Sequence, residues 1–456
     1  MVRKKFFMAL FLAAIVVTFA HSQKLWTLEE CIEYAHKNNL QVQKQNLQVK
    51  MAESNFSYAR ANVLPTANAF ANYTFNKGRA PNFDTYEYVD QAFEDGNVGI
   101  ESRMSLFNGL SNYFTIRQSR YNLLARIEDV ENLKDNITLS IGGAYLQILL
   151  NEELLKVAEN QLEITRLQVE KIQRLTEVGN LSRGELYEIQ AQEARETAAV
   201  VRAKNDLEVS YLALVQYMDL EPAEMIAFKI EEPELNMENA GYLRSVDSVY
   251  ADALRELHMI KSAEYNLKSS EKGLAAHKGL IFPSLSLRYL YYTLYSEISL
   301  NPEDPVAQYR WMDQLQDKGY QQLSFSLNIP IFNNLYTTNR ISTAKVNLLD
   351  SEVNLDITRQ TLFKNIQKAF TDANAAFENY EANLETVRSM EEAYKYTEQK
   401  FNVGMVSSVD YNLAKNNLTN AQSDLLQAKY MYIFYSKILD FYSGLPITLY
   451  TSCNNS

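Results

Sequence analysis

The sequence predicts an α+β protein in which one unit occurs twice, each copy combining long helices with a pair of amphipathic strands. Glycine (14) and proline (9) are scarce in a chain of 456 residues, so few residues interrupt helices. Two segments of 67 residues, 110–176 and 335–401, contain no proline, and as helices each would extend roughly 100 Å at about 1.5 Å per residue. Finally, the same motifs recur in both halves of the chain at a nearly constant offset.

Short matching motifs carry this internal repeat. Most are separated by 225 residues: Phe107-Asn108 and Phe332-Asn333, Ala144 and Ala369, Val178-Gly179 and Val403-Gly404, Ala203-Lys204 and Ala428-Lys429. Upstream, Leu64-Pro65 corresponds to Phe282-Pro283 at an offset of 218, so we expect a loop of different length between the two anchors. Two copies of one unit therefore account for nearly the whole chain.

Each copy is predicted to run helix, strand, strand, long helix, helix. The first copy spans 23–233, with a helix over 28–64, strands near 66–76 and 97–107, and helices over 110–176 and 182–217. The second spans 234–456, with a helix over 249–282, strands near 284–296 and 320–330, and helices over 335–401 and 407–442. Thr27 and Glu30 form a capping-box pattern at the first helix start. Pro65 and Pro283 mark helix–strand junctions, because proline disfavours helical geometry in the residue before it.

Residues 1–22 are predicted to be a secretory signal peptide that is cleaved. Three cations at 3–5 precede an apolar run over 6–20, and Ala20 and Ser22 are small residues at the −3 and −1 positions of a cleavage site. Without these cations, 41 basic residues face 56 acidic ones, a net charge of −15 that excludes a basic nucleic-acid-binding protein as a first hypothesis. No later run of 18 apolar residues exists, so any membrane-spanning part has to be a β-barrel.

The strands show the alternation of apolar and polar residues that a sheet with two different faces requires. The apolar members are Ala67, Ala69, Ala71, Tyr73 and Phe75 in the first strand, Val98, Ile100, Met104 and Leu106 in the second, and Leu323, Phe325, Leu327 and Ile329 in the fourth. The third strand carries several tyrosines. About ten residues of this pattern suit a membrane barrel strand, and a soluble half-buried sheet is the alternative.

Apolar residues in the long helices recur at coiled-coil spacing. In the first copy the seam residues are Leu155, Ala158, Leu162, Thr165, Val169 and Ile172, of which the threonine is polar; in the second they are Tyr380, Val387, Tyr394 and Phe401. This pattern predicts helix packing rather than a cofactor site. Gly179 and Gly404 are predicted to close the long helices in left-handed conformation, which makes each the tip of a helical hairpin. Gly142-Gly143 inside the first long helix indicates a close approach of another helix, with a local bend as the alternative.

Motifs for catalysis or cofactor binding are absent from the sequence. The chain after residue 22 has three histidines, none of them in a zinc-binding pattern, and it has no phosphate-binding, nucleophile-elbow or dinucleotide motif. Its two cysteines, Cys31 and Cys453, lie near opposite ends of the chain and do not suggest a disulfide framework. We therefore expect no enzymatic activity, no cofactor and no metal.

Taken together, these features resemble the TolC-type outer-membrane efflux family over about residues 27–446. The most specific residues are Phe401-Asn402-Val403-Gly404 with Asp410 six residues after the glycine, and Leu175 and Val178-Gly179 with Glu185 at the same distance. The helix–strand junctions at Pro65 and Pro283 also fit, as do the strand–helix junctions Leu106-Phe107-Asn108-Gly109 and Ile331-Phe332-Asn333-Asn334.

The resemblance implies a homotrimer whose protomers each give four strands to a twelve-stranded outer-membrane β-barrel and helices to a periplasmic tunnel. It implies export of substrates from the periplasm or from an inner-membrane pump, in a tripartite efflux or type I secretion system with a periplasmic adaptor. A periplasmic coiled-coil adaptor or structural protein without a barrel is the alternative.

The family pattern also places acids at a constriction near the tunnel tip, where Asp410 and its first-copy counterpart Glu185 fall. The sequence departs from that pattern at Val406, where an arginine can occur, and at Leu413, where a second acid can occur. Acids favoured by the dipole at a helix N-terminus are the alternative interpretation of both carboxylates. We further expect Tyr394 and Phe401 to hold the closed tip by packing, helped by nearby bases at 174, 183 and 400.

Overall fold

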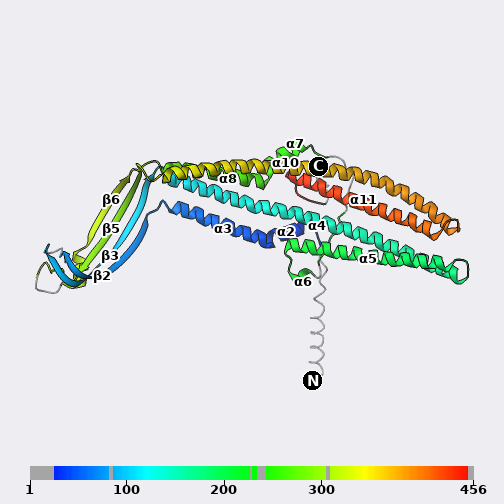
Figure 1. Cartoon of the computed structure of the whole chain (residues 1–456), viewed down its shortest axis with the longest axis horizontal. Coiled ribbons are helices and arrows are strands. Elements are labelled where there is room, and N and C mark those ends of the chain that lie inside the picture. The colour runs from blue at the N-terminus through cyan, green and yellow to red at the C-terminus, as the bar shows by residue number, and fades with distance from the viewer. Residues whose placement is uncertain (1–24, 82–85, 226–227, 234–242, 305–308, 450–456) are drawn as a thin grey trace, which may run out of the picture. The chain divides into compact units, whose positions relative to one another are not determined.

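The computed structural model describes residues 25–81, 86–225, 228–233, 243–304 and 309–449 of the chain (Figure 1). These residues fold into two compact units, and each unit draws on both sequence repeats. Unit 1 contains the chain up to Asn46 together with Glu128–Lys261 and Ile357–Ser456; unit 2 contains Leu47–Ile127 and Ser262–Asp356. The compact units therefore do not follow the repeat boundary between 233 and 234, which stays a prediction. The predicted signal peptide lies outside the described residues.

The four longest helices form within one or two residues of their predicted ends. They are α4 (Ser111–Glu177), α5 (Arg183–Met218), α10 (Tyr336–Asn402) and α11 (Ser408–Tyr442), and α4 and α10 are each 67 residues long. The long helices begin one residue later than predicted because Leu110 and Leu335 have φ of 63° and 62°, which is not helical. No helix within the described ranges is both long enough and apolar enough to cross a membrane.

The first helix of each copy, predicted as continuous, is broken in both repeats, which corrects that prediction. In their place are α2 (Leu28–Asn38) with α3 (Leu40–Ala61), and α7 (Val246–Glu256) with α8 (His258–Gly279). The breaks fall at Asn39 and Leu257, whose ψ values of 127° and 132° are extended. These positions differ by 218 residues, the upstream offset of the repeat. Hydrogen bonds explain the first break: the Asn39 side chain accepts from the backbone N–H of Gln41 and Val42 and donates to the Tyr217 carbonyl.

The capping box predicted at the start of α2 is confirmed. The Thr27 hydroxyl accepts from the Glu30 N–H at 3.2 Å, and the Glu30 carboxylate accepts from the Thr27 N–H at 3.3 Å. Just before it lies an element that the sequence did not reveal. Strand β1 (Leu25–Trp26) pairs in parallel with β4 (Lys229–Ile230), so the connection between the repeats returns to the start of the described chain. The short helix α6 (Pro222–Met225) precedes β4.

Unit 2 contains an antiparallel sheet in the order β2-β3-β5-β6. Its strands are β2 (Thr66–Pro81), β3 (Tyr88–Asn108), β5 (Ser284–Ser296) and β6 (Tyr320–Asn328). The first two extend well beyond their predicted ends toward the loop between them. Strand β6 ends two residues before the predicted Pro330, which has no N–H to donate to a ladder. The predicted third strand has its predicted bounds.

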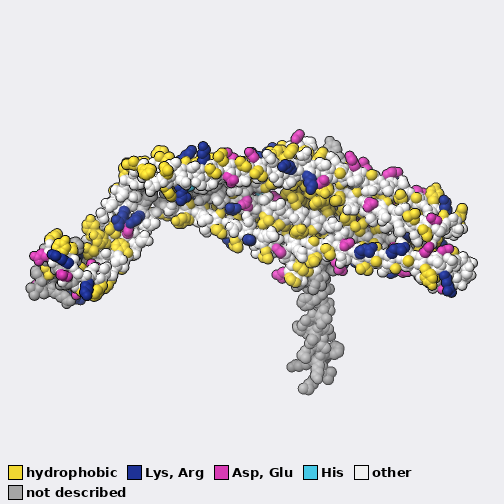
Figure 2. Space-filling view, viewed as in Figure 1, with side chains coloured by type: hydrophobic (Ala, Val, Ile, Leu, Met, Phe, Trp, Pro, Cys, Tyr) yellow, Lys and Arg dark blue, Asp and Glu magenta, His cyan; other side chains and the backbone are white. Residues whose placement is uncertain are grey.

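The sheet has one apolar face, as the alternation predicts. The register places Ile100 beside Ala69 on one side and Tyr291 on the other, and Met104 beside Leu287, which in turn lies beside Phe325. The next row is mostly polar: Glu101 lies between Asn68 and Leu290, and Leu290 lies beside Gln322. The apolar side chains are uncovered: Phe325 is 65% exposed and Phe75 is 70% exposed. The view in Figure 2 shows hydrophobic side chains over the strands of this sheet.

Helix packing in unit 1 surrounds a core of small and branched apolar residues from α7, α8, α10 and α11. Its members are Val249, Ala253, Leu257, Ile260, Leu362, Ile366, Ala369, Ala373 and Leu439. The close approach predicted at the double glycine is confirmed at Gly143, where an added Cβ would lie 3.0 Å from the Phe434 ring. Leu257, the residue at the break between α7 and α8, belongs to this core. Its buried side chain packs the break against apolar neighbours.

Candidate functional site

The two hairpin tips have the same backbone geometry. Gly179 and Gly404 have φ of 80° and 76°, which confirms their predicted left-handed conformation. At the first tip the Gly179 N–H donates to the Thr176 carbonyl and the Asn180 N–H to Leu175; the second tip repeats both bonds. An added Cβ would meet nothing within 4 Å at either glycine, so glycine is required by the backbone conformation and not by space.

The candidate gate acids lie in the first turns of the helices that leave the tips. Asp410 completes a capping box with Ser407, whose hydroxyl accepts from the Asp410 N–H at 3.2 Å and donates to its carboxylate at 2.8 Å. At the equivalent position, the Glu185 N–H donates to the Ser182 hydroxyl at 3.3 Å. Both acids are therefore at a helix N-terminus, where the dipole favours negative charge. Asp410 therefore caps α11 within its own chain. This capping is compatible with the predicted position of Asp410 at a constriction.

The candidate gate aromatics converge on a residue that the sequence reasoning missed. Phe401 stacks on Tyr411 with ring centroids 4.7 Å apart, and the Tyr394 hydroxyl lies 2.8 Å from the Tyr411 hydroxyl. Tyr411 is only 1% exposed, and burial raises the pKa of its phenol and of Tyr394. Both predicted residues thus pack inside their own hairpin, between α10 and α11. Of the expected bases, Arg174 contacts Glu170 at 3.5 Å, one turn away on α4.

Polar contacts connect the α4–α5 hairpin to the α10–α11 hairpin near the tips. Lys171 donates to the Asn402 side chain at 2.8 Å, and Ser408 donates to Glu188 at 2.9 Å. Farther along the helices, the amide of Gln192 donates to the side chain of Asn416 at 3.1 Å. We call these contacts the inter-hairpin seam. Each joins a residue of the first repeat to a residue of the second.

A buried ion pair lies beside the inter-hairpin seam and also joins the two hairpins. Lys415 of α11 and Glu196 of α5 are 2% and 7% exposed, and their charged groups lie 3.3 Å apart. The Lys415 ammonium also donates to the Gln161 carbonyl at 2.8 Å and to the Thr165 hydroxyl, which itself contacts Glu196. Burial lowers the pKa of Lys415 because it disfavours the charged form. A buried charge with four oxygen partners holds the two hairpins in one register.

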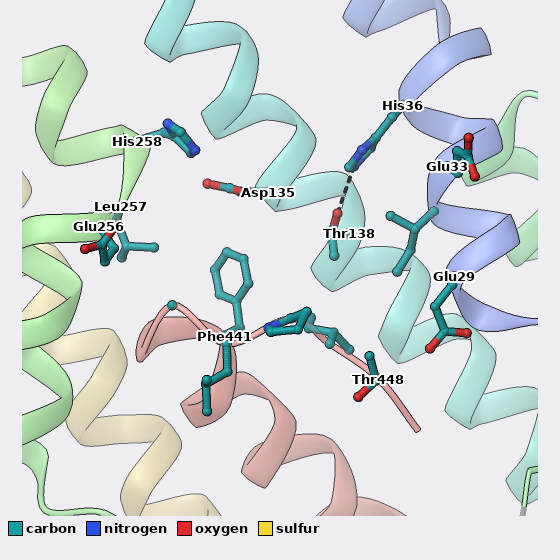
Figure 3. Close-up of a pocket in the computed structure, with 15 residues that line it drawn as sticks. Glu29, Glu33, His36, Asp135, Thr138, Glu256, Leu257, His258, Phe441 and Thr448 are labelled. Carbon is teal, nitrogen blue, oxygen red and sulfur yellow. Dashed lines mark hydrogen bonds between the residues drawn. The ribbon is translucent and has the colours of Figure 1, made fainter. Parts of the chain in front are cut away.

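A cavity of about 590 Å³ lies elsewhere in unit 1, among α2, α4, the α7–α8 break and the chain after α11 (Figure 3). His36 points at Thr138 with 2.9 Å between Nε2 and Oγ1, and His258 Nδ1 lies 2.7 Å from the Glu128 carboxylate. Asp135 lies on the same side of the cavity as His258. Burial raises the pKa of Asp135 to about 6. Among the residues that the structure describes, no group of three or more His, Cys, Asp or Glu could hold a metal ion.

Sequence reasoning located the tips but missed Tyr411, Lys415 and Glu196. The helical spacing of the sequence could have predicted that Tyr411 and Lys415 are buried. They are one turn apart and share a helix face with the buried residues Ala421 and Ala428. A lysine on an otherwise inward-facing stripe requires a buried partner. Its identity could not be read from sequence, because Glu196 is 219 residues away.

The fold and the sequence both have counterparts among known proteins. The outer membrane efflux protein family model matches residues 31–219 and 249–440. The chain is 21% identical to outer membrane efflux protein BepC of Brucella suis over 89% of this chain and 82% of BepC. It is 21% identical to outer membrane protein TolC of Escherichia coli over 91% of this chain and 81% of TolC.

Solved structures share the architecture at lower sequence identity. The outer membrane protein VceC of Vibrio cholerae superposes with a TM-score of 0.77 at 16% identity, over 92% of this chain and 96% of VceC. The CmeC outer membrane channel of Campylobacter jejuni superposes with a TM-score of 0.76 at 18% identity, over 92% of this chain and 86% of CmeC. The two segments that match the family model together cover most of the chain, one in each sequence repeat. The chain therefore belongs to the outer membrane efflux protein family.

Proposed function

We propose that this protein is an export channel of the outer membrane, active as a homotrimer. In this proposal each protomer gives its four strands to a twelve-stranded barrel and its helices to a periplasmic tunnel. Substrates enter from the periplasm or from an inner-membrane pump that a periplasmic adaptor couples to the tunnel. The signal peptide, residues 1–22, directs export and is then cleaved.

The observation that carries the proposal is a sheet with an uncovered apolar face and two open edges. Within the described residues, β2 and β6 each have one neighbouring strand, and each of the four strands has exposed side chains on the apolar face, among them Phe75, Ile100, Tyr291 and Phe325. Unpaired strand edges are not tolerated in lipid, and four strands are too few to close a barrel. Pairing β2 with β6 of another protomer satisfies both edges, and lipid then covers the apolar face.

The hairpin tips are the proposed gate and docking point. Three copies of Asp410 and of Glu185 would bring up to six carboxylates to one opening. The tips also expose apolar side chains to a protein partner: Val178, Val403 and Met405 are 70%, 71% and 73% exposed. Hydrophobic side chains lie among charged ones at these ends in Figure 2. Such a mixed surface suits reversible docking of an adaptor.

Accessibility in intact cells tests the placement of the two ends. We would introduce a cysteine at Glu303, in the β5–β6 loop, or at Asn180, at the first tip, with Cys453 replaced by serine. A bulky membrane-impermeant maleimide should label the Glu303→Cys variant in intact cells and the Asn180→Cys variant only after the outer membrane is permeabilised. Equal protection of both sites in intact cells would favour a periplasmic adaptor without a barrel.

Conduction tests the channel itself. Purified protein in planar bilayers should give small cation-selective currents, because the chain without its signal peptide carries a net charge of −15 and acids lie at both tips. Heat-inactivated protein from the same preparation is the control. Anion selectivity would contradict the proposed role of the acids.

A further inference from the structure

The loop between β5 and β6 contains a short helix, α9 (Trp311–Asp317), that is fastened to the sheet. Gln314, 1% exposed, makes the attachment: its carbonyl accepts from the Ser296 N–H at 3.0 Å, and its amide donates to the carbonyls of Ser296 and Tyr309. The Thr293 hydroxyl donates to the Leu315 carbonyl at 2.8 Å. These bonds hold α9 against the loop end of β5.

The attachment determines which face of the sheet α9 covers. Thr293 is beside Val98 in the register, and Val98 is beside Ala71, so all three belong to the apolar face. Helix α9 therefore lies on the apolar face of the sheet at its loop end. The proposed function puts this face against lipid.

An open groove of about 390 Å³ separates α9 from the sheet. Ala71, Gly96 and Val98 line it with small side chains. Asn72 and Asn97 also line it, and the Asn72 amide donates to the Asn97 side chain at 2.8 Å. Its remaining walls include Tyr73, Tyr295, Trp311 and Leu315. Trp311 is 56% exposed and its neighbour Met312 is 46% exposed, so the helix presents large apolar surface beside the groove.

We propose that α9 is a membrane-interface anchor and that its groove holds an acyl chain of an outer-membrane lipid. This proposal rests on the proposed placement of the sheet in the outer membrane. Tryptophan and tyrosine concentrate where the apolar layer meets water, because their rings are apolar and their N–H or O–H is polar.

The ends of α9 suit the polar side of that boundary. Arg310 is the N-terminal flanking residue, and the Lys318 ammonium lies 5.3 Å from the Tyr309 ring just after the last turn. Basic side chains at this level favour anionic head groups. Ala71, Tyr73 and Val98 line the groove and also belong to the apolar face, so an acyl chain that covers this face is next to the groove. A lipid acyl chain fits this lining better than a peptide, because most lining side chains are apolar or aromatic and the Asn72 amide already donates to Asn97.

The tryptophan content of the chain makes the test direct. Only Trp26 and Trp311 occur, so Trp26→Phe leaves Trp311 as the single tryptophan, which can be excited selectively over tyrosine. We would reconstitute this variant in vesicles of phosphatidylcholine brominated on its acyl chains. Trp311 should lose most of its emission relative to unbrominated vesicles and respond weakly to aqueous acrylamide. Strong acrylamide quenching without bromine quenching would overturn the anchor.

Two further variants separate the parts of the proposal. Adding Ala71→Leu fills the groove and should restore much of the emission lost to brominated lipid; unchanged quenching would overturn the acyl-chain site. Moving the fluorophore with Trp26→Phe, Trp311→Phe and Phe325→Trp reports on the sheet away from α9. Bromine quenching at residue 325 but not at Trp311 would reject the anchor and keep the channel. Absence of quenching at both would reject the placement of the sheet in the membrane.

Discussion

Lys415 is a charged side chain in an environment that disfavours charge. Its ammonium is buried with Glu196, Thr165 and the Gln161 carbonyl, at the junction of α4, α5 and α11. Buried pairs contribute little net stability compared with apolar residues, but removal of one partner leaves an uncompensated charge. This asymmetry can be measured.

Lys415→Met should lower the free energy of unfolding by about 3–5 kcal/mol because Glu196 then remains buried without its cation. The double variant Lys415→Met with Glu196→Leu should recover most of that loss. Lys395→Met is the control, since its pair with Glu392 is 3.7 Å long and more than 60% exposed, and such pairs contribute at most about 1 kcal/mol. Denaturant titration of the purified protein measures all three. A double variant less stable than Lys415→Met would contradict this view of the pair.

Asp135 should make stability depend on pH in the acidic range. Burial raises the pKa of Asp135 from 3.8 to about 6 against the opposing charges of His258 and Lys261, while Glu128 and Glu131 add to the rise. The folded state then binds more protons than the unfolded state between these two values, so the free energy of unfolding falls as pH rises through this window.

Asp135→Asn should remove this dependence, so that the variant gains stability relative to the parent protein as pH rises from 4 to 6. The exposed Asp424→Asn on α11 serves as the matched control and should leave the pH profile parallel to the parent's. Thermal unfolding at a series of pH values provides the measurement. A difference between parent and Asp135→Asn that stays constant across the window would contradict the assignment.

At the scale of elements, the Asn39 amide and the Asp219 carboxylate, which accepts from the Leu40 N–H at 2.9 Å, cap the start of α3 at the α2–α3 break. Asn39 is 6% exposed, and its carbonyl satisfies two N–H groups at the start of α3. Asn39→Ala removes this cap and the bond to the Tyr217 carbonyl, and we expect a loss of about 0.5–2 kcal/mol in unfolding free energy. The neighbouring Asn38→Ala removes only a bond one turn back to Tyr34 and should cost less. Equal losses would show that Asn39 does not set the break.

The tip acids are predicted to control ion selectivity rather than folding. Like charges repel by about 1 kcal/mol per pair at 4 Å in water, and more where water is excluded. Asp410→Asn combined with Glu185→Gln should therefore weaken cation selectivity and divalent block in planar bilayers. If both properties stay unchanged, these acids only cap their helices.

Closure of the tips is predicted to depend on the aromatic stack between α10 and α11. Phe401→Ala removes the ring that stacks on Tyr411 and should raise the resting conductance by loosening the hairpin. Tyr396→Ala, at a position 64% exposed on the same helix, is the matched control and should leave conductance unchanged. Single-channel recordings distinguish the two. Equal conductance of the Phe401→Ala variant and the parent would argue against a role of this stack in closure.

For the whole molecule, the open sheet edges predict the assembly state. Extraction in mild detergent should yield a particle with three copies of the 52.4 kDa chain, less its signal peptide. The physical reason is that the edges of β2 and β6 need hydrogen-bond partners in lipid. Mass measurement by light scattering or native mass spectrometry tests this, with denatured protein as the monomer reference. A folded monomer in detergent would contradict the proposed architecture.

Local and periodic features of the chain were readable from the sequence. Scarcity of proline and glycine predicted α4 and α10, and the positions of Gly179 and Gly404 predicted how these helices end, because a left-handed residue closes a helix wherever it occurs. Alternation predicted the apolar face of the sheet, since side chains change sides at each residue of a strand. The capping box at Thr27 was also readable, because its partners are three residues apart.

The tertiary structure alone decided the features that join distant parts of the chain. The helix break at Asn39 depends on a bond to Tyr217, and the partner of Lys415 is Glu196, 219 residues away. The position of α9 on the apolar face depends on hydrogen bonds between the Gln314 side chain and the Ser296 backbone. No periodic pattern in the sequence predicts these bonds. Periodicity determines which side of a helix or strand is apolar, but it carries no information about which polar groups meet once those sides are buried. Those pairings depend on the three-dimensional register of packed helices and strands.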